Sequence, residues 1–287
     1  MRSGFAALAG RPNVGKSTLV NGLVGEKVAI VSRVPHTTRH RIRGVWTQDD
    51  AQLVLVDLPG WQKPIDMLTA RMQNRVDETI ADDLDVILLV VNARERIGAG
   101  DRYIAGRIFS LGIPVVIVVN KVDRLTGGHI AEQMKAAAAL GDFHAVHPVS
   151  AKTGDGLEEL RSDLVSLLPE GPLLYPRGEV TDMPLEARIA ELVREQALRL
   201  TREEVPHSLT AEVVEIDERR VHIRLYTETE SQKMILIGKG GSMVREIGRW
   251  ARPGIEALLG RTIYLELQVK ASPKWRRNET MLERLGL

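Results

Sequence analysis

The chain of 287 residues contains no cysteine, which excludes disulfide bonds and thiolate metal sites. It also lacks any apolar run of the roughly 18 to 20 residues that a membrane-spanning helix requires. Residues 1–4 do not lead into the apolar segment and cleavage site of a signal peptide. No internal repeat or low-complexity tract is visible. These absences predict a soluble, cytoplasmic protein.

The chain has little net charge, +1 at neutral pH, but its charges are unevenly placed. Residues 233–277 contain ten Lys and Arg against three Asp and Glu, whereas residues 212–230 contain six acids and three arginines. A basic segment inside a near-neutral chain favours a polyanionic partner such as nucleic acid. The alternative is a solvated charged face without a partner.

Residues 1–168 alternate short apolar runs with helical patterns. The near-continuous apolarity of residues 86–91 is typical of a parallel strand covered on both faces. The alternation predicts an α/β domain with a mostly parallel sheet and helices on both faces. Strands are predicted at 5–9, 53–56, 86–91, 115–119 and 145–149, and helices at 16–23, 68–80, 130–140 and 157–168.

Residues 169–184 contain four prolines and two glycines, and they are predicted to be a linker. A second, smaller α+β domain is predicted over residues 185–272, followed by a C-terminal tail, 273–287. Pro253 is expected to kink or interrupt a helix in this domain. The predicted order is helix 185–200, strands 209–216 and 220–226, a short element 233–237 that the pattern does not assign, helix 242–259 and strand 262–269.

Residues 10–17, GRPNVGKS, match G-x-x-x-x-G-K-[ST], the loop whose backbone N–H groups cradle nucleotide phosphates. Glycines at positions 10 and 15 allow the backbone to approach the phosphates closely. Lys16 is expected to reach the β and γ phosphates, and Ser17 to bind Mg2+. The residues assigned to this part of the site are Asn13, Gly15, Lys16, Ser17 and Thr18.

Asp57-Leu58-Pro59-Gly60 follows the predicted strand 53–56. Asp57 is expected to hold Mg2+ directly or through water. The N–H of Gly60 is expected to contact the γ-phosphate and to lose that contact after hydrolysis, as a switch does. The next residue, Trp61, cannot orient water as a glutamine does. No catalytic residue is therefore assigned, and slow unaided hydrolysis is expected.

Asn120-Lys121-Val122-Asp123 follows another predicted strand. Asp123 can accept hydrogen bonds from the N1–H and N2 amino groups of guanine, and adenine would leave this carboxylate unpaired. The motif therefore predicts selection of GTP over ATP and excludes a nucleotide kinase. Asn120 is expected to brace the pocket and the stem of Lys121 to lie against the base. Ser150, Ala151 and Lys152 are expected to complete the base pocket through their backbone N–H groups.

These four motifs resemble those of translation-factor-class GTPases, and residues 35–40 (PHTTRH) resemble switch I of the Era family. The resemblance implies that Thr38 is a Mg2+ ligand, with Thr37 as the alternative. Asparagine at the position of Asn13 helps related GTPases to bind K+, so a potassium site at Asn13 is a further hypothesis. Leu58 departs from the usual D-T-P-G sequence of the family.

Gly238-Lys239-Gly240-Gly241 matches G-x-x-G, the loop by which KH domains clamp a nucleic-acid backbone. The order of elements resembles a type II KH domain, which would make residues 233–237 a short helix. Trp275, in the basic tail, either stacks on a base or covers the core of the domain. RNA contacts are assigned to Lys233, Gly238, Lys239, Gly240, Gly241, Arg245 and Arg249, because glycines admit phosphates and basic side chains neutralise them.

A GTPase core followed by a single KH domain resembles the Era family of bacterial ribosome-assembly GTPases. The resemblance implies a monomeric switch that binds GTP, GDP and Mg2+, hydrolyses GTP, and binds the 3′ end of 16S rRNA in the precursor of the 30S subunit. It also implies that any contact with the inner membrane is peripheral. Two alternatives stay open: an RNA-binding adaptor with little hydrolysis, and a GTPase associated with RNA modification.

Overall fold

The computed structural model describes residues 1–34, 37–59, 65–81 and 84–287, and for residues 77 and 79–81 it describes the backbone alone. Gly60, Trp61 and the first two residues of the expected switch I segment, 35–36, therefore lie outside the described residues. The chain divides into two compact units. The first comprises Met1–Ala29, Thr38–Lys63 and Arg71–Asp182, and the second comprises Ile30–Thr37, Pro64–Ala70 and Met183–Leu287.

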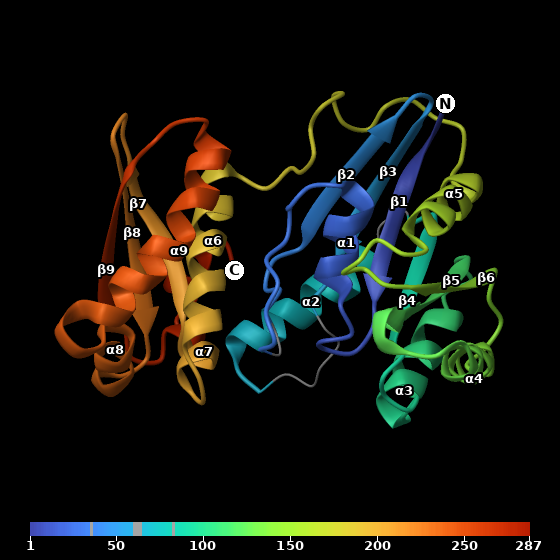
Figure 1. The fold of residues 1–287 in the computed structure, drawn as a ribbon, viewed down its shortest axis with the longest axis horizontal. Coiled ribbons are helices and arrows are strands. Elements are labelled where there is room, and N and C mark those ends of the chain that lie inside the picture. Colours follow the sequence, from blue (N-terminus) through green and yellow to red (C-terminus); the bar gives the residue numbers. More distant parts are fainter. Residues whose placement is uncertain (35–36, 60–64, 82–83) are drawn as a thin grey trace. The chain divides into compact units, whose positions relative to one another are not determined.

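The first unit contains a six-stranded sheet in the order β2-β3-β1-β4-β5-β6 (Figure 1). β2 runs antiparallel to β3, and all other neighbouring strands are parallel. This arrangement confirms the predicted mostly parallel sheet. The strands are β1 Arg2–Ala9, β2 Ile42–Gln48, β3 Ala51–Asp57, β4 Val86–Asn92, β5 Val115–Asn120 and β6 Ala145–Val149.

Helices cover both faces of this sheet. Successive strand residues point to opposite sides, and apolar residues on each side pack against helices. Leu19 of α1 and Leu160 of α5 pack in one core, which includes Leu88 of β4. Ile104 of α3 packs in another core, which includes the next strand residue, Leu89. The helices of the first unit are α1 Lys16–Val24, α3 Ala99–Phe109, α4 Gly127–Ala138 and α5 Leu157–Leu167, and α2, Met67–Ala81, begins in the second unit and continues in the first.

The parallel strands bring the predicted motifs to one edge of the sheet. β1 leads into the phosphate loop, β3 ends at Asp57, β5 ends at Asn120, and β6 is followed by Ser150. Their register supports this placement, because Asp57 lies opposite Leu8 of β1 and Asn120 lies opposite Val149 of β6. Ligands of open α/β sheets bind outside the carboxyl ends of the strands. The fold therefore positions all four motifs for one common site.

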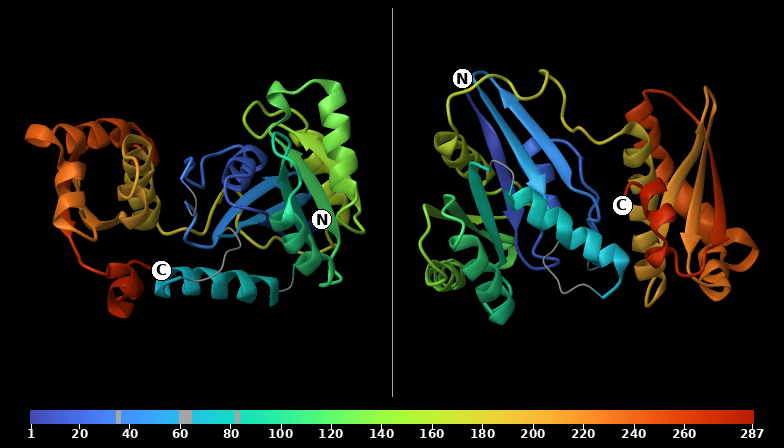
Figure 2. Two further views of the ribbon diagram at one scale, coloured as in Figure 1. Left: turned by 90° about the horizontal axis from the view of Figure 1, so that it is seen from below. Right: turned by 180° about the vertical axis from the view of Figure 1, so that it is seen from behind.

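The second unit contains a three-stranded sheet in the order β7-β8-β9, with β7 antiparallel and β9 parallel to β8. α6 and α9 lie on the same face of that sheet (Figures 1 and 2). This arrangement confirms the predicted α+β class. The elements are α6 Leu185–Leu200, α7 Val205–Ser208, β7 Thr210–Ile216, β8 Arg220–Thr227, α8 Glu230–Ile237, α9 Ser242–Leu259, β9 Tyr264–Ala271 and α10 Glu279–Arg284.

Two local features of the second unit, the helix before the G-x-x-G loop and the helix that contains Pro253, could be established only from the structure. The element that the sequence pattern did not assign is the helix α8, which begins with a capping box formed by Thr229 and Gln232. The expectation that Pro253 interrupts the next helix is wrong, because α9 runs through it. Pro253 is exposed, so the backbone carbonyl left without an N–H partner can be hydrated. Ile247 and Ile255 are buried on either side of it and hold both halves of α9 against the core.

Trp275 in the C-terminal tail is fully buried, and its Nε1–H donates a hydrogen bond of 2.7 Å to the carbonyl oxygen of Ser208. The tail therefore covers part of the core of the second unit. Of the two roles considered for this tryptophan, the structure supports the structural one.

Replacing Trp275 with alanine should lower the free energy of unfolding by about 3–5 kcal/mol, because it removes a buried aromatic side chain and leaves a cavity. Trp250→Ala is the matched control, since Trp250 is 49% exposed, and it should cost less than about 1 kcal/mol. Denaturant unfolding followed by circular dichroism measures both. Equal losses in the two variants would contradict the assigned burial.

Candidate nucleotide and nucleic-acid sites

The phosphate loop adopts a backbone that most side chains would disturb. Gly15 has a φ of 103°, and a Cβ added there would lie 2.4 Å from Nδ2 of Asn120. Asn13 also lies in the left-handed region, with a φ of 63°. α1 begins directly after the loop at Lys16, so its N–H groups and its positive helix end face the same space. This geometry suits an anion such as a phosphate.

Lys16 is buried beneath this loop. Its Nζ donates hydrogen bonds to the carbonyl oxygens of Gly10 at 3.1 Å and Arg11 at 3.3 Å. Burial lowers the pKa of Lys16, and the negative charge of Asp57 opposes that shift. A phosphate group would offset the cost of burying the ammonium.

Three side-chain oxygens converge beside Lys16. Oγ of Ser17 donates to Oδ2 of Asp57 at 2.6 Å, and Oγ1 of Thr38 lies 3.0 Å from Ser17 Oγ and 3.2 Å from Asp57 Oδ2. Asp57 is fully buried, and among the described residues its Oδ1 has no hydrogen-bond partner. Burial raises the pKa of Asp57, whereas Lys16 and the two hydroxyls lower it. Oxygen ligands with an unpartnered carboxylate atom fit Mg2+.

The structure distinguishes the two threonines that were considered as Mg2+ ligands. Thr38 lies in the oxygen cluster with Ser17 and Asp57. Oγ1 of Thr37 instead forms hydrogen bonds of 2.7 Å with Oγ of Ser32 and 2.6 Å with the carbonyl oxygen of Val34. This geometry supports Thr38 rather than Thr37.

The side chain of Asn120 joins three segments of the site, and Asn120 is only 1% exposed. Its Nδ2 donates to the carbonyl oxygen of Val14 at 2.9 Å, while its Oδ1 accepts from the N–H groups of Lys121 at 2.8 Å and Ala151 at 3.0 Å. This supports the bracing role expected for Asn120. It also shows that the Ala151 N–H, expected to face the base, has a protein acceptor in this structure.

Asp123 lies near this network, and each of its carboxylate oxygens accepts a hydrogen bond from the side chain of another residue. Oδ1 accepts a hydrogen bond from Oγ of Ser150 at 3.3 Å, and Oδ2 accepts one from Nη2 of Arg94 at 2.9 Å. Desolvation raises the pKa of Asp123, but the charge of Arg94 and the hydrogen bond from Ser150 lower it overall. Asp123 is therefore ionised at neutral pH, as an acceptor for guanine must be.

The remaining residues assigned to the nucleotide site lie around this centre. Nζ of Lys121 donates to the carbonyl oxygen of Asn13 at 2.5 Å, which extends the lysine stem along the phosphate loop. Thr18 lies half-buried on α1, and Lys152 is exposed in the turn after β6. The sequence analysis did not identify Arg94, and a single arginine after a strand carries no motif that could have done so.

The G-x-x-G loop of the second unit lies between α8 and α9. Gly238 has a φ of 72°, and a Cβ added there would lie 2.8 Å from the backbone nitrogen of Met243. Lys239 is exposed in the loop, and Nη2 of Arg245 donates to the carbonyl oxygen of Gly240 at 2.9 Å. Lys233, also assigned to RNA, forms an ion pair of 3.0 Å with Glu230. The loop is thus built as a compact, positively charged turn.

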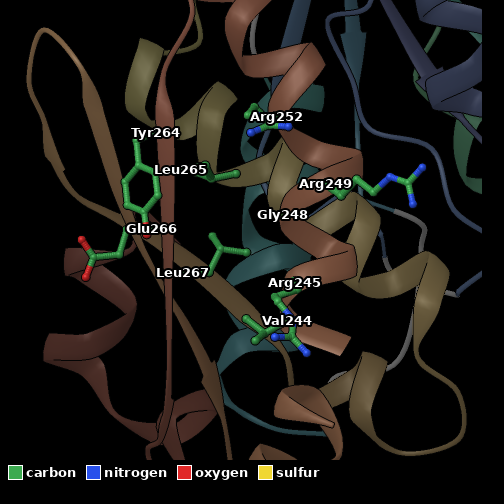
Figure 3. Close-up of a pocket in the computed structure, with 9 residues that line it drawn as sticks. All are labelled: Val244, Arg245, Gly248, Arg249, Arg252, Tyr264, Leu265, Glu266 and Leu267. Carbon is green, nitrogen blue, oxygen red and sulfur yellow. The ribbon is translucent and has the colours of Figure 1, made fainter. Parts of the chain in front are cut away.

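A groove of about 430 Å³ lies between α9 and β9 (Figure 3). Leu265 and Leu267 of β9 point toward α9, and the three exposed arginines of this face lie along α9 (Figure 3). Gly248 of α9 faces Leu267, since a Cβ added there would lie in van der Waals contact with it at 3.4 Å. An apolar floor with a basic wall suits the bases and phosphates of a single-stranded nucleic acid. The arginines are Arg245, Arg249 and Arg252.

Comparison with known proteins matches two separate parts of the chain to two family models. Residues 5–121 match the model of the 50S ribosome-binding GTPase family, and residues 203–276 match the KH domain model. The GTPase Era of Mycobacterium tuberculosis (strain ATCC 25177 / H37Ra) is 47% identical over 99% of this chain and 98% of its own length. The chain belongs to the Era family of GTPases. Era from Mycolicibacterium smegmatis is 45% identical over the same shares.

Solved Era structures match the whole chain. A crystal structure of an Aquifex aeolicus Era variant bound to GDP·AlF4⁻ has a TM-score of 0.95 and 37% identity, covering 100% of this chain and 99% of that one. A structure of Era with MgGDPNP and nucleotides 1506–1542 of 16S ribosomal RNA has a TM-score of 0.93 at the same identity and coverage. These matches confirm the predicted Era family and its combination of a GTPase domain with a KH domain.

In the part of the chain that the structure describes, every helix is too short or too polar to cross a membrane.

Replacing Thr38 with alanine should raise the Mg2+ concentration needed for half-maximal GTP binding by about tenfold, because it removes one oxygen of the cluster around Asp57. Thr37→Ala is the matched control and should change that concentration less than about twofold. Titrating Mg2+ against a fluorescent GTP analogue measures both variants. A larger effect at Thr37 than at Thr38 would reverse the assignment.

Proposed function

We propose that this Era-family protein is a GTP-hydrolysing switch that binds the 3′ end of 16S rRNA and assists assembly of the small ribosomal subunit. One observation carries the proposal. A buried cluster of side-chain oxygens and the ionised carboxylate of Asp123, which can accept hydrogen bonds from guanine, lie at one edge of the sheet. The same chain contains a KH groove lined by arginines. An Era structure similar over the whole chain holds MgGDPNP and nucleotides 1506–1542 of 16S rRNA, which supports both assignments.

The residues of the first unit divide the work of nucleotide binding. The loop backbone and Lys16 receive the phosphates, and Asp123 accepts the donors of the guanine ring. Ser17, Thr38 and Asp57 would hold Mg2+, which when bound neutralises the charge that develops on the phosphates. Asn120 keeps these segments in register through its three hydrogen bonds.

Hydrolysis is proposed to be slow without a partner. The residue after Gly60 is a tryptophan, which cannot orient an attacking water as a glutamine does. We also propose that K+ stimulates turnover through Asn13, as the resemblance to related GTPases implies. Equal turnover in Na+ and K+ buffers would contradict this potassium hypothesis.

In the second unit, the G-x-x-G loop and the groove beside α9 are proposed to bind the rRNA. Lys239, Arg245 and Arg249 are exposed and can neutralise phosphates, while Leu265 and Leu267 offer apolar surface to the bases. If GTP changes the affinity of this groove for RNA, RNA must change the affinity for GTP by the same factor. This reciprocity would make the protein a switch rather than two independent binding modules.

The adaptor alternative is less well supported. An adaptor with a vestigial nucleotide site would not require Lys16, Ser17 and Asp123, and here all three are present and hydrogen-bonded within the site. We propose a cytoplasmic monomer whose contact with the inner membrane, where it occurs, is peripheral. The domain boundaries that we propose are 1–168 for the GTPase domain and 185–272 for the KH domain.

The protein should bind GDP at least about a thousandfold more tightly than ADP, because adenine does not supply the donors that guanine offers to the Asp123 carboxylate. Asp123→Ala should remove most of this preference. Competition binding with a fluorescent guanine nucleotide gives both affinities. A wild-type protein without the preference, or an Asp123→Ala variant that keeps it, would overturn the nucleotide assignment.

Arg249→Ala should weaken binding of a single-stranded fragment of the 16S rRNA 3′ end and reduce the slope of log K against log salt concentration by about one, since one phosphate contact is lost. Arg219→Ala is the control, because Arg219 is also exposed but lies in the turn between β7 and β8. Fluorescence anisotropy at several salt concentrations measures the slopes. Similar slopes for the two variants would exclude the groove as the RNA site.

A further inference from the structure

An arginine from a different loop holds the carboxylate that is proposed to select guanine. Arg94 lies two residues beyond Asn92, the last residue of β4. Its Nη2 donates to Oδ2 of Asp123 at 2.9 Å, and its Nε donates to the carbonyl oxygen of Lys121 at 3.2 Å. One guanidinium group therefore contacts both the backbone and the critical side chain of the base-reading motif.

The backbone that carries Arg94 is itself held in place. The N–H of Ala93 donates to the carbonyl oxygen of Asn120 at 2.8 Å, which attaches the turn to the end of β5. Oδ1 of Asn92 accepts the N–H of Arg94 at 3.1 Å, and Nδ2 of Asn92 donates to Oε1 of Glu95 at 2.5 Å. The arginine side chain thus leaves a fixed turn, so its contact with Asp123 has a defined geometry.

The hydrogen bonds at Asp123 leave room for the guanine base. An ionised carboxylate offers about four acceptor positions, two on each oxygen. Ser150 uses one position on Oδ1, and Arg94 uses one on Oδ2. Side chains of other residues thus occupy one position on each oxygen, and guanine presents two adjacent donors, N1–H and the N2 amino group. The two side-chain donors restrict rotation of the carboxylate and leave each oxygen an acceptor position that neither of them occupies.

The neighbouring Arg124 does not have this arrangement. Its Nε lies 3.9 Å from the same Oδ2, and its side chain is 74% exposed, compared with 38% for Arg94. An exposed charge at that distance is screened by solvent and contributes little. Arg94 and Arg124 therefore form a matched pair with the same charge near the same carboxylate but with different contacts.

We infer that Arg94 is a positioning residue for guanine: it orients Asp123 and so raises both the affinity for guanine nucleotides and the selectivity against adenine nucleotides. This inference rests on the proposed nucleotide site, since it requires that guanine binds at Asp123. The competing hypothesis is that Arg94 weakens guanine binding, because a guanidinium group carries donors like those of the guanine edge. Arg94 would then compete with the base for the carboxylate of Asp123.

The test measures the affinity of the full-length protein for GDP and ADP by competition against a fluorescent GDP analogue. Arg94→Ala should weaken GDP binding by about tenfold, equivalent to about 1.4 kcal/mol, and leave ADP binding unchanged. Arg94→Lys should restore part of the loss, because it keeps the charge but lacks the rigid fork that reaches two acceptors. Arg124→Ala should stay within about twofold of the wild type. Melting temperatures confirm that each variant is folded.

Each other outcome overturns the inference in a recognisable way. Unchanged GDP binding in Arg94→Ala means that Arg94 does not position Asp123, and tighter binding means that it competes with guanine. Equal weakening of GDP and ADP means that the residue only supports the fold of the loop. A wild-type protein without a preference for GDP over ADP would instead contradict the proposed nucleotide function itself.

Discussion

The buried side-chain amide of Asn120 connects the segments on which the first unit depends. It binds the phosphate loop through Val14, its own loop through Lys121 and the segment after β6 through Ala151. A buried amide with all these partners is rigid, because any displaced segment would leave a polar group unpaired in the interior. The phosphate-binding and base-reading loops are therefore held at a fixed separation, as recognition of one nucleotide across both requires.

The two binding regions use charge in different ways. In the first unit Lys16 and Asp57 are buried, where an isolated charge is costly and a matching ligand is correspondingly favoured. In the KH groove Arg249 and Arg252 are exposed, so their attraction for a polyanion is longer in range, weaker for each contact and sensitive to salt. The first arrangement suits a small ligand of defined shape, and the second suits a flexible strand.

Much of the architecture could be predicted, because near-continuous apolar runs and turn-forming residues are local signals. Two elements of the first unit were missed for physical reasons. β2, Ile42–Gln48, is an antiparallel edge strand interrupted by Arg43 and Gly44, so it lacks the apolar run of a central strand. α3 contains Gly100 and Gly106, which weaken the helical pattern, and it forms because Ile104 and other apolar residues pack on the sheet.

The sequence by itself determined where the nucleotide motifs lie and which base they select, because phosphate loops and guanine acceptors depend on a few adjacent residues that follow a strand. Tertiary structure alone decided which partners those residues have. Arg94 reaches Asp123 across a separation of 29 positions, and Trp275 reaches Ser208 across 67. These contacts exist because neighbouring strands and helices pack side by side, and no local pattern records which distant side chain will lie opposite.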